Sequence, residues 1–169
     1  CIFLYNVQNG RVENSTVTGS WYGIHLYSSL NITLTNNAVY GNYGDGIYLD
    51  SFSYYNIVTN NIIHTNHIGI NLKTSSNNTL VNNAVYENHW DGIRLWNSSN
   101  NTLTDNAVYE NYGDGIYLDL SSSNALTNNA VYENNDGIEL DSFSHYNIVT
   151  NNTVYDNHIG INLKSSSNN

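Results

Sequence analysis

Four acidic residues share a spacing that would place their carboxylates side by side. Asp114 and Asp136 lie 22 residues apart, as do Asp119 and Asp141, and Glu139 lies close by in the sequence. Carboxylates held one strand spacing apart repel, and a hard cation with oxygen ligands relieves the repulsion. The sequence therefore predicts a calcium site at Asp114, Asp119, Asp136 and Asp141. A solvated acidic stripe is the alternative, and no other cofactor is predicted.

Aromatic residues near these acids suggest a second kind of chemistry, the binding of sugar rings. An exposed aromatic strip is a plausible surface for a glycan or another partner. Trp96 and Tyr117, together with Glu139, are the predicted ligand-binding residues. Filling of space over a corner of the chain is the alternative role for the aromatic side chains.

A repeat must position all of these residues. The motif Gly-Ile-x-Leu recurs every 22 or 23 residues, beginning at Gly23, Gly46, Gly69, Gly92, Gly115, Gly137 and Gly160. Two further apolar columns follow in each repeat, where a column is the set of equivalent positions on successive repeats. Changes in length fall outside these columns, as expected of a solenoid with strands in register. The prediction is an all-β parallel β-helix of about seven turns, with three short strands per turn, over residues 1–169.

Alternation along a strand gives the direction of each side chain. Ile and Leu of the motif share the inner face, so the residue between them points outward. The outward positions carry His25, Tyr48, Asn71, Arg94, Tyr117, Glu139 and Asn162.

Asparagine accounts for 34 of the 169 residues and also lies in columns. Asn tolerates the left-handed backbone of a tight corner, and stacked amides can form hydrogen-bonded ladders. We expect a buried structural ladder at Asn36, Asn60, Asn82, Asn128 and Asn151. Two more Asn columns are predicted, one from Asn56 to Asn169 and one from Asn42 to Asn157. A column of Tyr with His64 predicts aromatic stacking next to a corner.

The repeats resemble a known group of proteins. Segments such as Ser98 to Leu118 are similar to the right-handed parallel β-helix repeats of NosD-like proteins and archaeal cell-surface proteins, within the group of carbohydrate-binding proteins and sugar hydrolases. The resemblance implies a right-handed β-helix but no single activity, because such repeats carry many functions.

No catalytic residue is predicted. Residues 135–139 resemble part of the polygalacturonase pattern, but the Asp-Asp pair, Gly-His-Gly and Arg-x-Lys are missing, so the acid and base of an inverting glycosidase cannot be assigned. Residues 45–78 also match residues 136–169 at 27 of 34 positions, a shift of four turns. Nearly copied blocks favour a spacer, stalk or lattice over an enzyme.

Charge and composition limit the partners. A net charge of -10 with only 4 Lys and Arg argues against nucleic acid, and no apolar run is long enough for membrane insertion. Glycosylation motifs in the permissive Ser/Asn connection make Asn77, Asn97 and Asn100 candidates if the protein is exported.

These observations predict an extracellular or cell-surface protein with a structural or adhesive role. The chain would be a segment of a longer repeat array, and it would contact neighbouring repeats or associate end to end into a fibre. The alternative is a carbohydrate-binding or polysaccharide-processing module.

Overall fold

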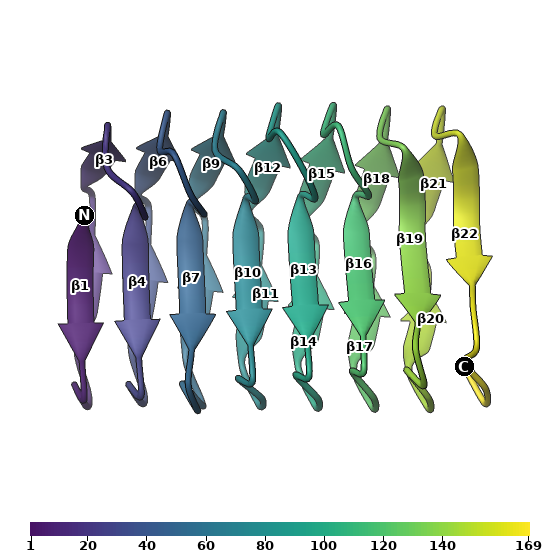
Figure 1. Ribbon diagram of the computed structural model, residues 1–169, viewed down its shortest axis with the longest axis horizontal. Helices are drawn as coiled ribbons and strands as arrows, with labels where there is room; N and C mark the ends of the chain where they lie inside the picture. The colour runs from purple at the N-terminus through teal and green to yellow at the C-terminus, as the bar shows by residue number, and fades with distance from the viewer.

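A computed structural model describes residues 1–169, which form one continuous parallel β-helix without any α-helix. Figure 1 shows the turns stacked along the long axis, with the N-terminus at one end of the rod and the C-terminus at the other. No helix long and apolar enough to cross a membrane is present. The predicted fold of about seven turns with three strands per turn is confirmed.

Three parallel sheets form the walls of the helix. The first sheet contains eight strands in sequential stacking order: β1 (Ile2–Tyr5), β4 (Ile24–Tyr27), β7 (Ile47–Asp50), β10 (Ile70–Lys73), β13 (Ile93–Trp96), β16 (Ile116–Asp119), β19 (Asp136–Asp141) and β22 (Ile159–Leu163). The second contains β2 (Arg11–Glu13), β5 (Thr33–Thr35), β8 (Ile57–Thr59), β11 (Thr79–Val81), β14 (Thr102–Thr104), β17 (Ala125–Thr127) and β20 (Ile148–Thr150). The third contains β3 (Thr16–Thr18), β6 (Ala38–Tyr40), β9 (Ile62–His64), β12 (Ala84–Tyr86), β15 (Ala107–Tyr109), β18 (Ala130–Tyr132) and β21 (Thr153–Tyr155).

The core is the set of apolar columns that the repeat predicts. Twenty-four buried residues form one cluster, with Ile and Leu from the first sheet and Leu, Ile or Val from the other two. The motif glycine lies where the chain enters the first sheet, and in every turn except that of Gly160 there is no space for a side chain. A Cβ on Gly46 would lie 2.6 Å from Ile63 Cγ2 and 2.7 Å from the carbonyl oxygen of Gly69. Glycine is therefore required at this position by close packing.

The asparagine ladder between the second and third sheets lies one residue later than predicted. Asn36, Asn60, Asn82, Asn128 and Asn151 are exposed and have φ between 54° and 57°. They turn the backbone, and the following residue points inward. The buried ladder is therefore Asn37, Asn61, Asn83, Asn106 and Asn129, continued by the half-buried Asn152. The prediction of a buried role for the first column was wrong.

Each ladder amide is satisfied by the adjacent turns. Asn129 Oδ1 accepts hydrogen bonds from the backbone N–H and from Nδ2 of Asn106, both at 3.0 Å. Asn129 Nδ2 donates to Asn152 Oδ1 and to the carbonyl oxygen of Leu103, both at 2.9 Å. The same pattern recurs in the Asn56 and Asn42 columns, which are confirmed as ladders. A buried serine column that includes Ser53, Ser75 and Ser98 adds a further ladder that the sequence analysis missed.

The predicted aromatic stack is also confirmed. The rings of Tyr40, His64, Tyr86, Tyr109, Tyr132 and Tyr155 stack along the third sheet with centroids 4.8–5.0 Å apart. Successive rings lie within 11° of parallel. Each turn therefore repeats the orientation of the one before it.

Candidate functional site

The outer face of the first sheet carries the residues that could bind a ligand. Strand registers align Arg94 of β13 with Tyr117 of β16, and Tyr117 with Glu139 of β19. Trp96 ends β13 on the same face, because it lies two residues after Arg94. The three predicted ligand-binding residues, Trp96, Tyr117 and Glu139, therefore share one face.

Two adjoining hollows form a groove on this face, and Arg94 lines both. We call them the aromatic hollow and the acidic hollow. The aromatic hollow has a volume of about 500 Å³ and is lined by Trp21, Tyr22, Tyr43, Gly44, Asp45, Tyr48, His67, Ile68, Asn71, Lys73, Arg94 and Trp96. The acidic hollow has a volume of about 420 Å³ and is lined by Trp90, Asp91, Arg94, Tyr112, Gly113, Asp114, Tyr117, Asn135, Asp136, Glu139 and Lys164. Trp96 therefore lines one hollow, and Tyr117 and Glu139 line the other.

Aromatic side chains on the turns before the first sheet flank the groove. Trp21, Tyr43, Trp90 and Tyr112 are each more than half exposed. Within the groove, Lys73 Nζ lies 5.1 Å from the ring centroid of Trp96, and the Arg94 guanidinium lies 5.3 Å from that of Tyr117. Three of the four basic residues of the chain therefore line a groove with exposed aromatic rings, since Lys164 lies there too.

A column of carboxylates lies along the entry to the first sheet, directly before the motif glycines. Its members are Asp45, Asp91, Asp114 and Asp136. Asp45, Asp91 and Asp136 are buried, and Asp114 is half-buried. The residue after each carboxylate is a glycine that packs closely against its neighbours, so the chain enters the sheet close to the core. The carboxylates are therefore buried or half-buried.

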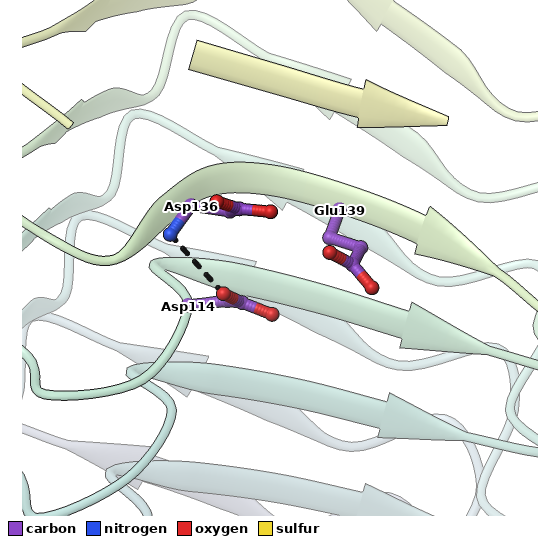
Figure 2. Close-up of side chains that lie close together, drawn as sticks. All are labelled: Asp114, Asp136 and Glu139. Carbon is purple, nitrogen blue, oxygen red and sulfur yellow. Dashed lines mark hydrogen bonds between the residues drawn. The ribbon is translucent and has the colours of Figure 1, made fainter. Parts of the chain in front are cut away.

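Asp114, Asp136 and Glu139 form the tightest group of acids (Figure 2). One carboxylate oxygen from each of the three lies within 4.8 Å of the other two, and the Asp136 N–H donates to Asp114 Oδ1 at 3.1 Å. Lys164 Nζ donates to both oxygens of Glu139, at 3.0 and 2.9 Å. Asn162 Nδ2 donates to Asp136 Oδ2 at 2.7 Å and to Glu139 Oε2 at 2.9 Å. Side chains of the protein thus supply the positive charge and the hydrogen bonds of this cluster.

The grouping predicted for calcium was wrong. Asp119 and Asp141 pair with each other at the far ends of β16 and β19. Five residues of extended strand separate Asp136 from Asp141, or about 16 Å. The structure therefore brings Asp114 and Asp136 together with Glu139, and places Asp119 and Asp141 in a separate pair. The three clustered carboxylates alone fall short of the six to eight oxygen ligands that calcium takes.

Burial raises the pKa of several groove carboxyls. The pKa of Asp91 rises to about 6, chiefly because the side chain is buried, and the negative charges of Asp114 and Glu139 add to the rise. Asp91 Oδ1 accepts the Asp114 N–H at 3.1 Å, but Oδ2 accepts no hydrogen bond, and Arg94 Nη1 lies 3.9 Å from it. Burial likewise raises the pKa of Asp45, Asp114 and Glu139. The groove therefore holds carboxyls that take up protons more readily than free ones.

The predicted glycosylation positions are accessible. Asn77, Asn97 and Asn100 are exposed at corners and have positive φ. Asn151 was expected to be buried in a ladder, but it is exposed too. Accessibility therefore does not separate these four positions, and modification at Asn77, Asn97 and Asn100 stays a prediction.

Several residues of the groove were not predicted from the sequence. Asp45, Asp91, Lys73 and Lys164 were not singled out. Their signal was positional, because the residue before each motif glycine and the residue two places after each outward position form columns of their own. Comparing these two columns across the repeats would have found all four residues.

Comparison with known proteins identifies the family. The family model described as "Right handed beta helix region" matches residues 1–73 and 23–169. The chain therefore belongs to the right-handed β-helix family. A comparison with curated proteins gave no match.

Several solved structures share the fold. The periplasmic alginate epimerase AlgG is 22% identical with a TM-score of 0.79, over 98% of this chain and 46% of that chain. The Dettilon tailspike protein is 19% identical with a TM-score of 0.80, over 98% and 39%. The mannuronan C-5 epimerase AlgE4 A-module of Azotobacter vinelandii is 14% identical with a TM-score of 0.58, over 95% and 60%. The chain spans less than two thirds of each of these proteins, and at these identities the likeness shows the fold alone.

Proposed function

We propose that this β-helix binds a linear polysaccharide along the groove of its first sheet. The observation that carries the proposal is the concentration of three of the four basic residues of the chain in one groove beside exposed aromatic rings. Sugar rings pack on aromatic faces, and a few placed polar groups orient the chain. The carboxylates of the groove can accept hydrogen bonds from sugar hydroxyls, and its basic side chains can bind acidic substituents of the sugar.

The direction of the groove supports a polymeric ligand. The aromatic hollow includes residues from Trp21 to Trp96, and the acidic hollow includes residues from Trp90 to Lys164. The two therefore follow the axis of the rod across several turns. Two of the similar structures are named as epimerases of alginate or mannuronan, which are polysaccharides, and this likeness supports the same class of ligand.

The proposal is binding without turnover. Asp136 and Glu139 both accept hydrogen bonds from Asn162, and Glu139 is also paired with Lys164. These partners hold the carboxylates in fixed positions as acceptors. Chromatography of an oligosaccharide after long incubation with the protein tests this part, and any shortened or isomerised product would contradict it.

A location outside the cell is also part of the proposal. AlgG is named as periplasmic, and a tailspike shares the fold. The particular likeness to NosD-like and archaeal surface repeats stays a prediction, as does the structural or adhesive role. Electron microscopy of the purified protein at several concentrations tests end-to-end association, for which long fibres are the expected result.

Calorimetric titration with alginate and neutral glucan oligosaccharides tests the binding function. Trp96→Ala and Tyr117→Ala should each weaken binding about tenfold, the usual loss at a central aromatic contact. Tyr146→Ala is the matched control, because Tyr146 is exposed but lines neither hollow. Unchanged affinity in both groove variants, or no binding of any oligosaccharide by the wild type, would overturn the proposal.

A further inference from the structure

The first sheet and the turns that lead into it carry the same polar arrangement twice, four turns apart. In the first copy, Asn71 Nδ2 donates to Asp45 Oδ2 at 2.8 Å, and His67 Nδ1 lies 3.6 Å from Asp45 Oδ1. In the second copy, Asn162 Nδ2 donates to Asp136 Oδ2 at 2.7 Å, and His158 Nδ1 lies 3.9 Å from Asp136 Oδ1. The Asp, His and Asn of the two copies correspond one to one through the four-turn duplication of the sequence.

One substitution in the groove distinguishes the copies. The outward residue after the motif isoleucine is Tyr48 in the first copy and Glu139 in the second. Each copy then has a lysine two residues after its asparagine, Lys73 and Lys164. Glu139 binds Lys164 through both carboxylate oxygens. Tyr48 has no carboxylate to offer, so the two lysines differ in what they contact.

Lys73 makes no ion pair and remains directed at the aromatic hollow. Its ammonium lies over the Trp96 ring, and its side chain is half-buried. Asp50, at the end of the neighbouring strand β7, forms no ion pair with Lys73 and instead accepts the N–H of Ser51 at 2.7 Å. Although the chain has 14 acidic and only 4 basic residues, the Lys73 ammonium therefore lies in the groove without a carboxylate to pair with.

The first copy also contains a side-chain oxygen that lacks a hydrogen-bond donor. Asn71 Oδ1 is buried and accepts no hydrogen bond. A buried acceptor without a donor is costly. The aromatic hollow therefore combines an ammonium without a carboxylate partner and the exposed ring of Trp96, next to an acceptor that receives no hydrogen bond from the protein.

We propose that Lys73 makes the aromatic hollow a subsite for an acidic sugar, and that Glu139 closes the equivalent subsite at Lys164. This inference rests on the proposed polysaccharide-binding function and names its substrate class. The carboxylate of a uronate residue would accept a charge-assisted hydrogen bond from Lys73 Nζ while the sugar ring packs on Trp96. In the acidic hollow, Lys164 is already held by Glu139, so neutral sugar residues would bind there through their hydroxyls.

The duplication itself supplies the test. Tyr48→Glu places in the first copy the residue that captures lysine in the second, and Glu139→Tyr makes the reverse exchange. Each introduced residue is the one that the other copy has at the same place in the repeat, so both variants are expected to fold. Lys73→Gln is a third variant that removes the ammonium and leaves Tyr48 and its contacts with Tyr22 and His25 in place.

Affinity is measured by calorimetric titration with alginate oligosaccharides and with the same oligosaccharides after reduction of their carboxyl groups to alcohols. The wild type should bind the acidic form more tightly. Tyr48→Glu and Lys73→Gln should each lower the ratio of the affinity for the acidic form to the affinity for the reduced form about tenfold, as expected for one charge-assisted hydrogen bond. Glu139→Tyr should strengthen binding of the acidic form.

The outcomes separate this inference from the proposed function. Equal affinity of the wild type for the two forms, or equal losses for both forms in Lys73→Gln, would overturn the acidic subsite while polysaccharide binding stands. Failure of the wild type to bind either form would overturn both. Selective loss of the acidic form in Tyr48→Glu and Lys73→Gln supports both.

Discussion

Replacing Asp91 by Asn should stabilise the protein at neutral pH and leave its stability unchanged at acidic pH. Asp91 is 3% exposed, and burial raises its pKa from 3.8 to about 6. A carboxyl with a raised pKa contributes stability that is fully present below pH 3.8 and is lost as the pH rises through about 6. The folded protein at pH 7.5 therefore holds a buried carboxylate at a cost that the neutral amide of the Asp91→Asn variant would not carry.

The size of the effect follows from the pKa. A rise of about two pH units corresponds to about 3 kcal/mol at pH 7.5. The pKa of about 6 already includes the favourable effect of Arg94, whose Nη1 lies 3.9 Å from Asp91 Oδ2. The introduced amide carbonyl can still accept the Asp114 N–H that Asp91 Oδ1 accepts now. The net gain in the free energy of unfolding at pH 7.5 should therefore be about 3 kcal/mol.

Urea unfolding between pH 3 and pH 8 measures this difference. The difference between Asp91→Asn and wild type should grow from about zero at pH 3 to about 3 kcal/mol at pH 7.5. Asp105→Asn is the control for replacing an exposed carboxylate by an amide, because Asp105 lies exposed at a corner where other turns have Asn. A destabilised Asp91→Asn variant at pH 7.5, or a difference independent of pH, would refute the reasoning.

Three further predictions concern packing and charge. Asn129→Ala should lower the free energy of unfolding by about 4 kcal/mol, since four hydrogen bonds lose their partner. The neighbouring Asn128→Ala should lower it by only about 1 kcal/mol, because alanine is disfavoured in the left-handed backbone of that position. Equal losses of the two variants in urea unfolding would contradict the ladder assignment. Gly46→Ala should cost about 3 kcal/mol or more in the same assay, because its Cβ would overlap Ile63, and a neutral result would contradict the close packing. Millimolar calcium should leave the melting temperature unchanged, because Lys164 already neutralises Glu139; a clear rise in a thermal scan would instead show a cation site at the acid cluster.

The fold could be predicted because the repeat fixes both register and facing. Gly-Ile-x-Leu identifies one strand of each turn, and alternation correctly placed Tyr117 and Glu139 on its outer face. The same alternation failed at the corner after Leu34. It assigned Asn36 to the inner face, but the left-handed backbone of Asn36 ends the strand, and Asn37 points inward instead. Period-two reasoning holds only while the chain stays extended.

The site was less predictable because it depends on which charges meet across turns. The sequence identified Asp114 and Asp136 as neighbours, and the structure adds that Glu139 lies with them. The ion pair between Lys164 and Glu139 joins side chains on adjacent turns. It could be predicted only by comparing the repeat position of the lysine with that of the glutamate, which lie in different columns. The burial of Asp91 depends on how close to the core the chain runs where it enters the first sheet.

The near-parallel aromatic stack has a consequence for how such a protein can change in evolution. Since successive rings lie within 11° of parallel, a turn added to the rod would continue in the same orientation. Duplication of whole turns therefore lengthens the binding face without rotating it, and Figure 1 shows the strands of the first sheet side by side along one face. The two Asp–His–Asn copies, four turns or about 19 Å apart, face the same side for this reason. A single point mutation could then specialise one copy, as the difference between Tyr48 and Glu139 illustrates.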